Sequence, residues 1–243
     1  MSLAKLTVIV LAVNETSSLE RIIKTIKDFD YFIEKIIIVS PKSVTNECKK
    51  TQLQLKKKYK KIETLIQDHK LPGYGGAIKF SMKFINSEYF IWIDGDGETD
   101  PKYLEEMYRI ITSDNSIDIV SASRFKRHNI FIKDYGFLDS ILTYSFQLLC
   151  RILFDSKITD YTVAYRIYRT SMFKKYNFIS NSQNFSLESL LPFVNNKVKI
   201  FEIYYLWTKR IEGTSRNNIF NKLSYFKIIF KYLLLKIKIK LLK

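Results

Sequence analysis

The sequence predicts an α/β protein with a mostly parallel central sheet flanked by helices. Continuous apolar runs, which are typical of strands buried on both faces, alternate with segments of helical periodicity through the first half of the chain. Several of these runs end in acidic, amide or glycine-rich residues. Strands that alternate with helices are joined by right-handed crossovers, and ligands of such sheets bind beyond the carboxyl ends of the strands. The polar ends of the runs are therefore expected on one rim of the sheet.

The first half of the chain supplies most of the predicted strands. An apolar strand at residues 6–13 is followed by polar residues that suit the capping of a helix at 17–29. A second strand at 36–39 precedes a Lys- and Gln-rich helix at 43–60. A third at 63–66 precedes a glycine loop and a helix at 76–86. A fourth apolar run at 90–93 ends in aspartates, and a helix at 101–113 and a strand at 117–122 follow.

Beyond Arg124 the alternation stops. Helices are expected at 134–157 and 185–194, and a strand at 198–207. No acidic residue follows Glu212, and eight of the sixteen excess positive charges lie after it. This pattern predicts a globular domain at residues 1–217 and a basic amphipathic tail at 218–243.

The composition allows a large core and constrains the partners. Of the 243 residues, 47% are hydrophobic, and Gly and Pro are few, which disfavours long disordered linkers. Cys48 and Cys150 have no metal-site spacing and suit a reducing compartment, and the N-terminus lacks the form of a signal peptide. The net charge of +16 requires an anionic partner, such as nucleic acid, an anionic membrane face or a phosphorylated substrate.

The most informative segment is Asp94-Gly-Asp96, at the end of the fourth apolar run. Positions i and i+2 of a strand point to the same face, so both carboxylates can aim at one point beyond the strand. Carboxylates at this density suit Mg²⁺ or Mn²⁺, and such ions usually also hold substrate phosphates. The alternative for this motif alone is an acidic surface turn, because Asp and Gly mark turns.

Taken together, the motifs resemble those of a known family. They are Asn14-Glu15, the glycine loop with Gly75 and Gly76, Asp94-Gly-Asp96, Ser123-Arg124-Phe125, the stretch from Asp160 to Arg169, and the stretch from Arg210 to Arg216. In this order, over about residues 5–217, they resemble the family 2 inverting glycosyltransferases with the GT-A fold. Within that family, the dolichyl- and polyprenyl-phosphate sugar synthases are the most similar branch.

The resemblance implies a metal site at the acidic segment. Asp96 would be the direct ligand of Mg²⁺ or Mn²⁺, and Asp94 would contact the ribose or a metal-bound water. Glu98 would be a further metal ligand, or else an acid that is favoured at a helix N-terminus. The ion would neutralise the charge that develops on the leaving nucleoside diphosphate.

The resemblance also implies a set of donor-binding residues. Asn14 and Glu15 would contact the nucleotide, or else only cap the next helix. Asp68 would read the base, or else be a solvated turn residue. Gly75 and Gly76 would allow the donor to approach the backbone.

The end of the second strand departs from the family. Residues 39–43 read Val-Ser-Pro-Lys-Ser, where related proteins usually carry Asp-Asp-Gly-Ser with a base-binding aspartate. Base recognition must therefore differ or be impaired, and the sequence does not distinguish UDP from GDP.

Three arginines and a polar loop are candidates for phosphate binding. Arg124, Arg166 and Arg210, with Ser215 and Arg216, would handle donor or acceptor phosphates, because arginine forms bidentate bonds to phosphate oxygens. A surface cation is the alternative for each arginine.

The role of Asp160 depends on the acceptor. A hydroxyl acceptor must lose a proton to a base, whereas a lipid phosphate is already an anion. Asp160 would be that base, or would orient the acceptor or the metal site, or would anchor Arg166 or the backbone.

Two segments predict contact with a membrane surface. No stretch approaches the roughly 20 apolar residues that span a bilayer. Residues 219–243 instead mix apolar residues with recurring lysines, and residues 140–150 are free of charge. A core or dimer helix is the alternative for 134–157, and a coiled coil is the alternative for the tail.

The sequence thus predicts a glycosyltransferase that is peripheral on the cytoplasmic, inner face of the cell membrane. It would move a sugar from a UDP- or GDP-linked donor to a polyprenyl phosphate. The alternatives are transfer to a hydroxyl of a cell-surface glycan, and a non-catalytic binding subunit. A nucleic-acid partner explains the charge but not the aspartates and is not expected. The oligomeric state, including a homo-oligomer, is left open.

Overall fold

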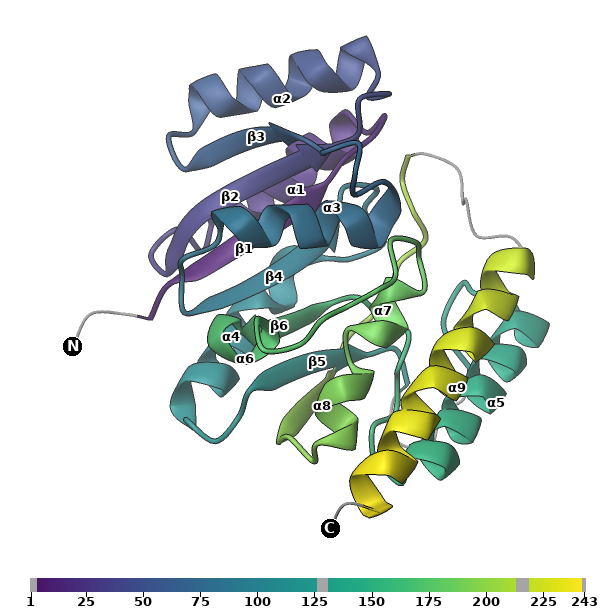
Figure 1. Ribbon diagram of the computed structural model, residues 1–243. Coiled ribbons are helices and arrows are strands. Elements are labelled where there is room, and N and C mark those ends of the chain that lie inside the picture. Colours follow the sequence, from purple (N-terminus) through teal and green to yellow (C-terminus); the bar gives the residue numbers. More distant parts are fainter. Residues whose placement is uncertain (1–3, 126–130, 213–218, 242–243) are drawn as a thin grey trace.

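A seven-stranded sheet forms the centre of the protein, in the order β3-β2-β1-β4-β6-β5-β7 (Figure 1). The computed structural model describes residues 4–125, 131–212 and 219–241. Strand β6 is antiparallel to both of its neighbours, and the other paired strands are parallel. The prediction of a mostly parallel α/β sheet is confirmed.

The first half of the chain follows the predicted order, with boundaries moved by a few residues. Its elements are β1 (Leu6–Leu11), α1 (Ser17–Lys27), β2 (Ile33–Ser40), α2 (Asn46–Lys58), β3 (Ile62–Ile66), α3 (Gly73–Ser81), the 3₁₀ turn η1 (Met82–Phe84), β4 (Tyr89–Asp94), the 3₁₀ turn η2 (Pro101–Tyr103), α4 (Leu104–Ser113) and β5 (Ile119–Ser123).

The second half is less regular. Its elements are α5 (Phe137–Phe154), β6 (Arg166–Arg169), α6 (Thr170–Phe173), α7 (Phe185–Glu188), α8 (Leu191–Asn195), β7 (Ile200–Tyr204) and α9 (Ile219–Leu241). The single helix expected at 185–194 is two short helices. The break precedes Pro192, which has no N–H to continue the helical ladder and would clash with the preceding turn. Strand β6 was not anticipated.

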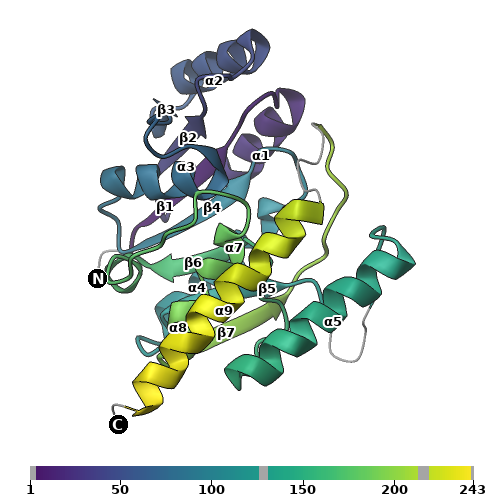
Figure 2. The ribbon, with the colours of Figure 1, turned by 45° about the vertical axis from the view of Figure 1, so that its right-hand side comes forward.

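The sheet is buried on both faces, as its continuous apolar runs predict. In β1, Val8 and Val10 face the cluster that contains residues of α1 and α4, whereas Ile9 faces the cluster that contains residues of α3, α7 and α8. Figure 2 shows the helices on the two sides of the sheet. Because both faces are covered, a ligand can reach the sheet only at an edge or beyond the strand ends.

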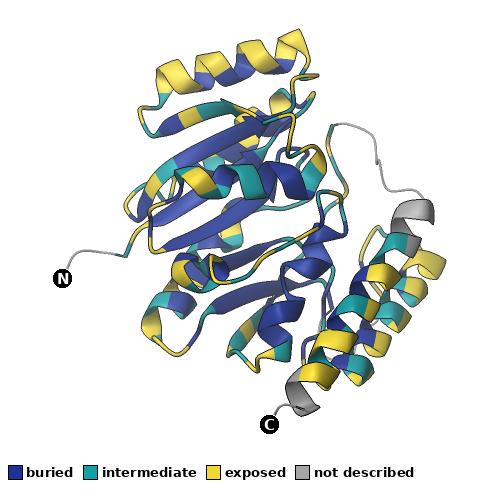
Figure 3. Cartoon of the chain, viewed as in Figure 1, coloured by how far each residue is buried: buried dark blue, intermediate teal, exposed yellow. Residues whose placement is uncertain are grey.

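Helix α9 packs on the same body as the sheet. Ile228, Ile229 and Tyr232 are buried, and the helix contacts α5, α7 and α8 (Figure 1). Its opposite side is exposed (Figure 3). The tail is therefore an integral layer at one end of the sheet.

Helix α5 lies alongside α9 and has an unusual composition. Among the described residues it is the one helix that is long and apolar enough to cross a membrane, by length and composition alone. The expectation that no segment reaches this threshold was therefore wrong. However, Gln147, Cys150 and Phe154 are buried against the domain, so α5 is attached to the fold along one side.

Candidate active site

The acidic cluster lies where β4 ends beside β1. Asp94 is the last residue of β4, and Asp96 is 8% exposed, with its Oδ1 accepting a bond from the Glu98 amide at 3.0 Å. Arg210 lies against both neighbouring acids. Its Nε and Nη2 donate to Glu98 Oε1 at 2.9 and 2.6 Å, and its Nη1 is 3.6 Å from Asp96 Oδ2. The structure therefore brings together four residues that the sequence assigned to metal or phosphate.

The cluster carries more negative charge than Arg210 neutralises. Burial raises the pKa of Asp94 well above its usual value, and the nearby charges of Asp96 and Glu98 raise it further. Burial also raises the pKa of Asp96 to about 6, against the lowering effects of the Glu98 amide and Arg210. An added cation would relieve this repulsion.

The cluster fits a hard divalent cation that is completed by a substrate. Among the described residues, no group of three or more His, Cys, Asp or Glu is placed to hold a metal by itself. Mg²⁺ commonly uses one or two carboxylates together with substrate phosphates and waters, so a complete protein cage is not required. Asp94 and Asp96 supply the two carboxylates, whereas Glu98 is engaged by Arg210.

Tyr74, which is not among the predicted site residues, also contacts the cluster. Its hydroxyl accepts a bond from Trp92 Nε1 at 3.1 Å, and a hydrogen bond from Tyr74 favours the ionised form of Asp94. The sequence signal for a role of Tyr74 in the site was its position in the glycine loop, next to the start of a helix.

The turn after β1 is held by its own carboxylate. Glu15 Oε2 accepts from the amides of Val13 and Asn14 at 2.5 and 3.0 Å, and Glu15 is 9% exposed. Asn14 is exposed. Helix α1 begins later, with Thr16 at its N-cap position, so neither predicted residue caps it. The turn leaves Asn14 free for a ligand beside the acidic cluster.

At the end of β3, Gln67 contacts the glycine loop, whereas its neighbour Asp68 was the residue predicted to read the base. Asp68 has only local contacts: its Oδ1 accepts a hydrogen bond from the Lys70 amide at 3.0 Å and lies 3.3 Å from His69 Nδ1. Its neighbour Gln67 is buried, and its Nε2 donates to Gly73 O at 2.7 Å. Adjacent residues at a strand end point to opposite sides, and this alternation was the signal that could have selected Gln67.

The loop glycines are needed for packing within the protein. A Cβ at Gly75 would lie 2.6 Å from Phe185 Cβ, and one at Gly76 would overlap the Leu71 carbonyl. Other parts of the chain therefore occupy the space beside these two glycines. The expected open approach of a donor to the backbone is not present there.

The end of β2 carries no acid. The Ser40 hydroxyl is buried and accepts a bond from Gln52 Nε2 at 2.7 Å. The side chain thus turns toward α2, and the structure offers no replacement carboxylate at this position.

Arg124 and Asp160 form a second, buried cluster. Asp160 has no exposed surface, and it accepts from Arg124 Nε and Nη2 at 2.7 and 2.8 Å. The amides of Thr162 and Val163 also donate to it. Burial alone would raise the pKa of Asp160, but the charge and hydrogen bonds of Arg124 lower it below its usual value. Both residues satisfy each other in this arrangement.

Arg166 lies in the interior of the fold and not at the rim. Arg166 is fully buried, and its guanidinium donates to Ser121 Oγ, Ser186 O and Tyr161 O at 3.0, 2.7 and 2.8 Å. It joins β6 to β5 and α7 and does not face a ligand, in contrast to the predicted phosphate contact. Ser215 and Arg216 fall outside the described residues.

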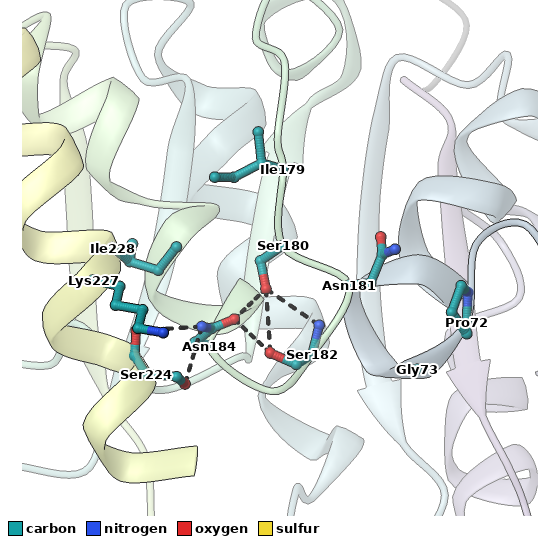
Figure 4. Close-up of a pocket in the computed structure, with 10 residues that line it drawn as sticks. All are labelled: Pro72, Gly73, Ile179, Ser180, Asn181, Ser182, Asn184, Ser224, Lys227 and Ile228. Atoms are coloured by element: carbon teal, nitrogen blue, oxygen red, sulfur yellow. Dashed lines mark hydrogen bonds between the residues drawn. The ribbon is translucent and has the colours of Figure 1, made fainter. Parts of the chain in front are cut away.

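A separate open cavity of about 530 Å³ lies between the glycine loop and α9 (Figure 4). Its lining includes Gly73, Asn184 and Lys227, and Asn184 Nδ2 bonds to Ser224 Oγ at 3.1 Å. Apart from Gly73 of the glycine loop, its lining contains none of the predicted site residues that the structure describes, and no carboxylate. The acidic rim, and not this cavity, is therefore the candidate active site.

The sequence model of one family, described as glycosyl transferase family 2, matches residues 7–177. The chain belongs to this family. It is a glycosyltransferase that takes its sugar from a nucleotide-sugar donor, and the matched region contains both carboxylate clusters. No curated protein sequence matches the chain.

Solved structures confirm the GT-A fold. A glucosyl-3-phosphoglycerate synthase from Mycobacterium tuberculosis, in complex with Mn²⁺, UDP and phosphoglyceric acid, superposes with a TM-score of 0.71 at 13% identity, over 96% of this chain and 78% of that one. A complex of that enzyme with Mn²⁺, UDP-glucose and phosphoglyceric acid gives 0.73 at 13% identity, over 95% and 80%. A complex with Mg²⁺ and UDP gives 0.69 at 14% identity, over 96% and 79%. These similarities do not single out the polyprenyl-phosphate branch that the sequence suggested.

Proposed function

We propose that this glycosyltransferase uses a UDP-linked sugar and transfers it, with inversion, to an acceptor that carries a phosphate. The observation that carries the proposal is the buried, under-neutralised pair Asp94 and Asp96 at the end of β4. Such a pair favours the binding of Mg²⁺ or Mn²⁺ with a diphosphate. Support comes from the structurally similar synthase, whose complexes contain Mn²⁺ with UDP or UDP-glucose.

The residues divide the work as follows. When bound, the ion supplies Lewis-acid stabilisation of the diphosphate that leaves. Asp94 and Asp96 would hold it, and Arg210, which contacts Asp96 and Glu98, would transfer its charge-assisted bonds from Glu98 to phosphate oxygens. The acceptor would attack the anomeric carbon from the face opposite the diphosphate, which inverts its configuration.

The state of Asp160 favours a phosphate oxygen as the nucleophile. A general base works best with a pKa near the operating pH, but Asp160 is held well below that range by Arg124. It is also fully engaged in hydrogen bonds. An acceptor that is already an anion needs no base, so we favour a polyprenyl phosphate over a glycan hydroxyl.

The exposed side of α5 and α9 supports a location at the cytoplasmic face of a membrane. Large apolar side chains are exposed on both helices, including Leu138 at 72%, Ile152 at 69% and Phe230 at 65%. Lys227 and Lys238 are exposed on the same helix as Phe230, and the tail contains no acid. Apolar groups flanked by cations fit the interface of an anionic bilayer. The enzyme would thus be peripheral, with α5 lying along the surface.

A transfer assay tests this proposal. The purified protein would be given UDP- or GDP-linked sugars with Mn²⁺ and one of two acceptors, a short-chain polyprenyl phosphate or phosphoglyceric acid. We expect transfer from a UDP-sugar to the polyprenyl phosphate, and loss of at least 100-fold in Asp96→Asn. The control Asp30→Asn, which removes an acid paired with Lys27 before β2, should retain activity.

The results would separate the alternatives. Undiminished transfer by Asp96→Asn would refute the metal assignment. Transfer only to phosphoglyceric acid would refute the lipid acceptor. The absence of metal-dependent binding of UDP and GDP would favour the non-catalytic subunit, which the Ser40 departure also suggests.

A further inference from the structure

Residues 208–212, here called the strap, cross directly over the acidic turn. The Thr208 hydroxyl donates to Gly97 O at 3.0 Å, and the Ile211 amide donates to Asp96 O at 2.8 Å. The Ile211 side chain covers Gly97, where an added Cβ would lie 2.8 Å from Ile211 Cδ1. Thr208 and Ile211 lie on either side of Arg210 in the sequence, so their contacts fix Arg210 above the acidic cluster.

The far end of the strap is anchored to a helix from the other end of the chain. Glu212 accepts six hydrogen bonds from the N-cap residue Thr16 and from Ser17 and Ser18, the first residues of α1. Oε2 accepts from Thr16 N, Ser18 N and Ser18 Oγ at 2.7, 3.2 and 2.8 Å. Oε1 accepts from Thr16 Oγ1, Ser17 N and Ser17 Oγ at 3.1, 3.2 and 2.6 Å.

This arrangement satisfies a need of α1 that its own sequence leaves open. The first N–H groups of a helix lack intrahelical partners, and the helix dipole favours an anion there. Thr16 occupies the N-cap position but makes no side-chain cap, so Glu212 supplies the missing acceptor. Although burial acts to raise the pKa of Glu212, these bonds lower it to about 2, so the carboxylate is charged at neutral pH.

We propose that Glu212 is a positioning residue for donor binding. It fastens the strap to the N-terminus of α1 and thereby holds Arg210 over the site of the donor diphosphate. The same contact ties the strap to the turn that carries Asn14, so the two sides of the donor site are held at a fixed separation. This inference rests on the proposed donor site for its consequence, but the fastening itself is a property of the protein without ligands.

Trp207 offers a direct readout of the strap. It precedes Thr208, is partly buried, and packs edge-on against Tyr135 with ring centroids 5.1 Å apart. The other tryptophan of the chain, Trp92, is fully buried, so quenching of fluorescence by acrylamide reports mainly on Trp207. Release of the strap should expose Trp207 and increase quenching.

The variants are Glu212→Ala, Ser17→Ala and the control Glu20→Ala. Ser17→Ala removes one bond from the α1 side and perturbs the fold least. Glu20 is an exposed acid in the same first turn of α1. We expect quenching to increase about twofold in Glu212→Ala, to increase less in Ser17→Ala and to stay unchanged in Glu20→Ala. In calorimetry, the Kd for UDP with Mn²⁺ should rise about tenfold in Glu212→Ala.

The two readouts distinguish this inference from the proposed function. Unchanged quenching in Glu212→Ala, or increased quenching with wild-type affinity for UDP, would overturn the positioning role. If the wild-type protein bound neither UDP nor GDP with Mn²⁺, the proposed function would fail, and the quenching result would still decide whether Glu212 fastens the strap.

Discussion

Removal of either partner of the Arg124–Asp160 pair should strongly destabilise the protein. Asp160 is fully buried and the Arg124 side chain is 11% exposed, so each single substitution leaves an uncompensated charge in the interior. Breaking a buried pair in this way costs about 3–5 kcal/mol. The whole free energy of unfolding of a domain is about 5–15 kcal/mol, so Asp160→Ala should remove a large part of it.

The pair should also show strong coupling. Once one partner is absent, removal of the other no longer strands a charge, so Arg124→Ala/Asp160→Ala should be more stable than the sum of the single changes by about 3 kcal/mol. The exposed pair Lys197–Asp155, with side chains 67% and 81% exposed, is the matched control, and its coupling should be about 0–1 kcal/mol.

Urea unfolding followed by tryptophan fluorescence at pH 7.5 measures all of these free energies. Because the folded-state pKa of Asp160 is lowered, its contribution is present above the usual pKa of about 4 and is lost as the pH falls. The difference between wild type and Asp160→Ala should therefore shrink below pH 4. A coupling below about 1 kcal/mol at neutral pH would refute the account of Asp160 as a structural carboxylate.

Three further outcomes are expected. Gly97→Ala should cost about 1–2 kcal/mol of stability, because φ is +87°, and should weaken UDP binding about tenfold. The control Gly136→Ala, with φ +84°, should affect only stability, and an equal affinity of the two variants for UDP would contradict the strap contact. Burial raises the pKa of Glu202 to about 7, so the melting temperature should fall as the pH rises from about 4.5 to 7 and should then level off. Glu202→Gln should flatten this pH profile, and an unchanged profile in the variant would show that another group titrates. Phe230→Ser should reduce co-sedimentation with anionic vesicles about tenfold, whereas Leu53→Ser, which alters an exposed residue of α2, should not reduce it. An equal loss of co-sedimentation in the two variants would argue against a membrane face on α9.

The sequence predicts the parallel part of the fold because its signals are local. Apolar runs such as residues 6–11 must be strands buried on both faces, and a polar or acidic end then falls on one rim. Asp94 and Asp96 were identified for this reason. Strand β6 was missed because its four residues, Arg166–Arg169, mix charged and apolar groups and pair in an antiparallel direction within a parallel sheet.

The sequence could not predict contacts that depend on the three-dimensional arrangement. Arg166 was expected to bind phosphate because arginine forms bidentate bonds to phosphate oxygens, but here neutral oxygens within the fold accept its hydrogen bonds. Glu212 carried no local signal, since its partners are 194 to 196 residues away. Gln67 is neutral, and the charged Asp68 beside it gives the stronger local signal for a ligand contact.

The distance in sequence between Glu212 and α1 has a consequence during protein synthesis. Chains emerge from the ribosome N-terminus first and tend to fold in that order. When α1 and the strands around it assemble, the carboxylate that completes the helix start has not yet been translated. The nascent protein must therefore carry an incomplete first helix until Glu212, 194 to 196 residues after its partners, has been translated, and a truncated product that stops before Glu212 would be released without that carboxylate.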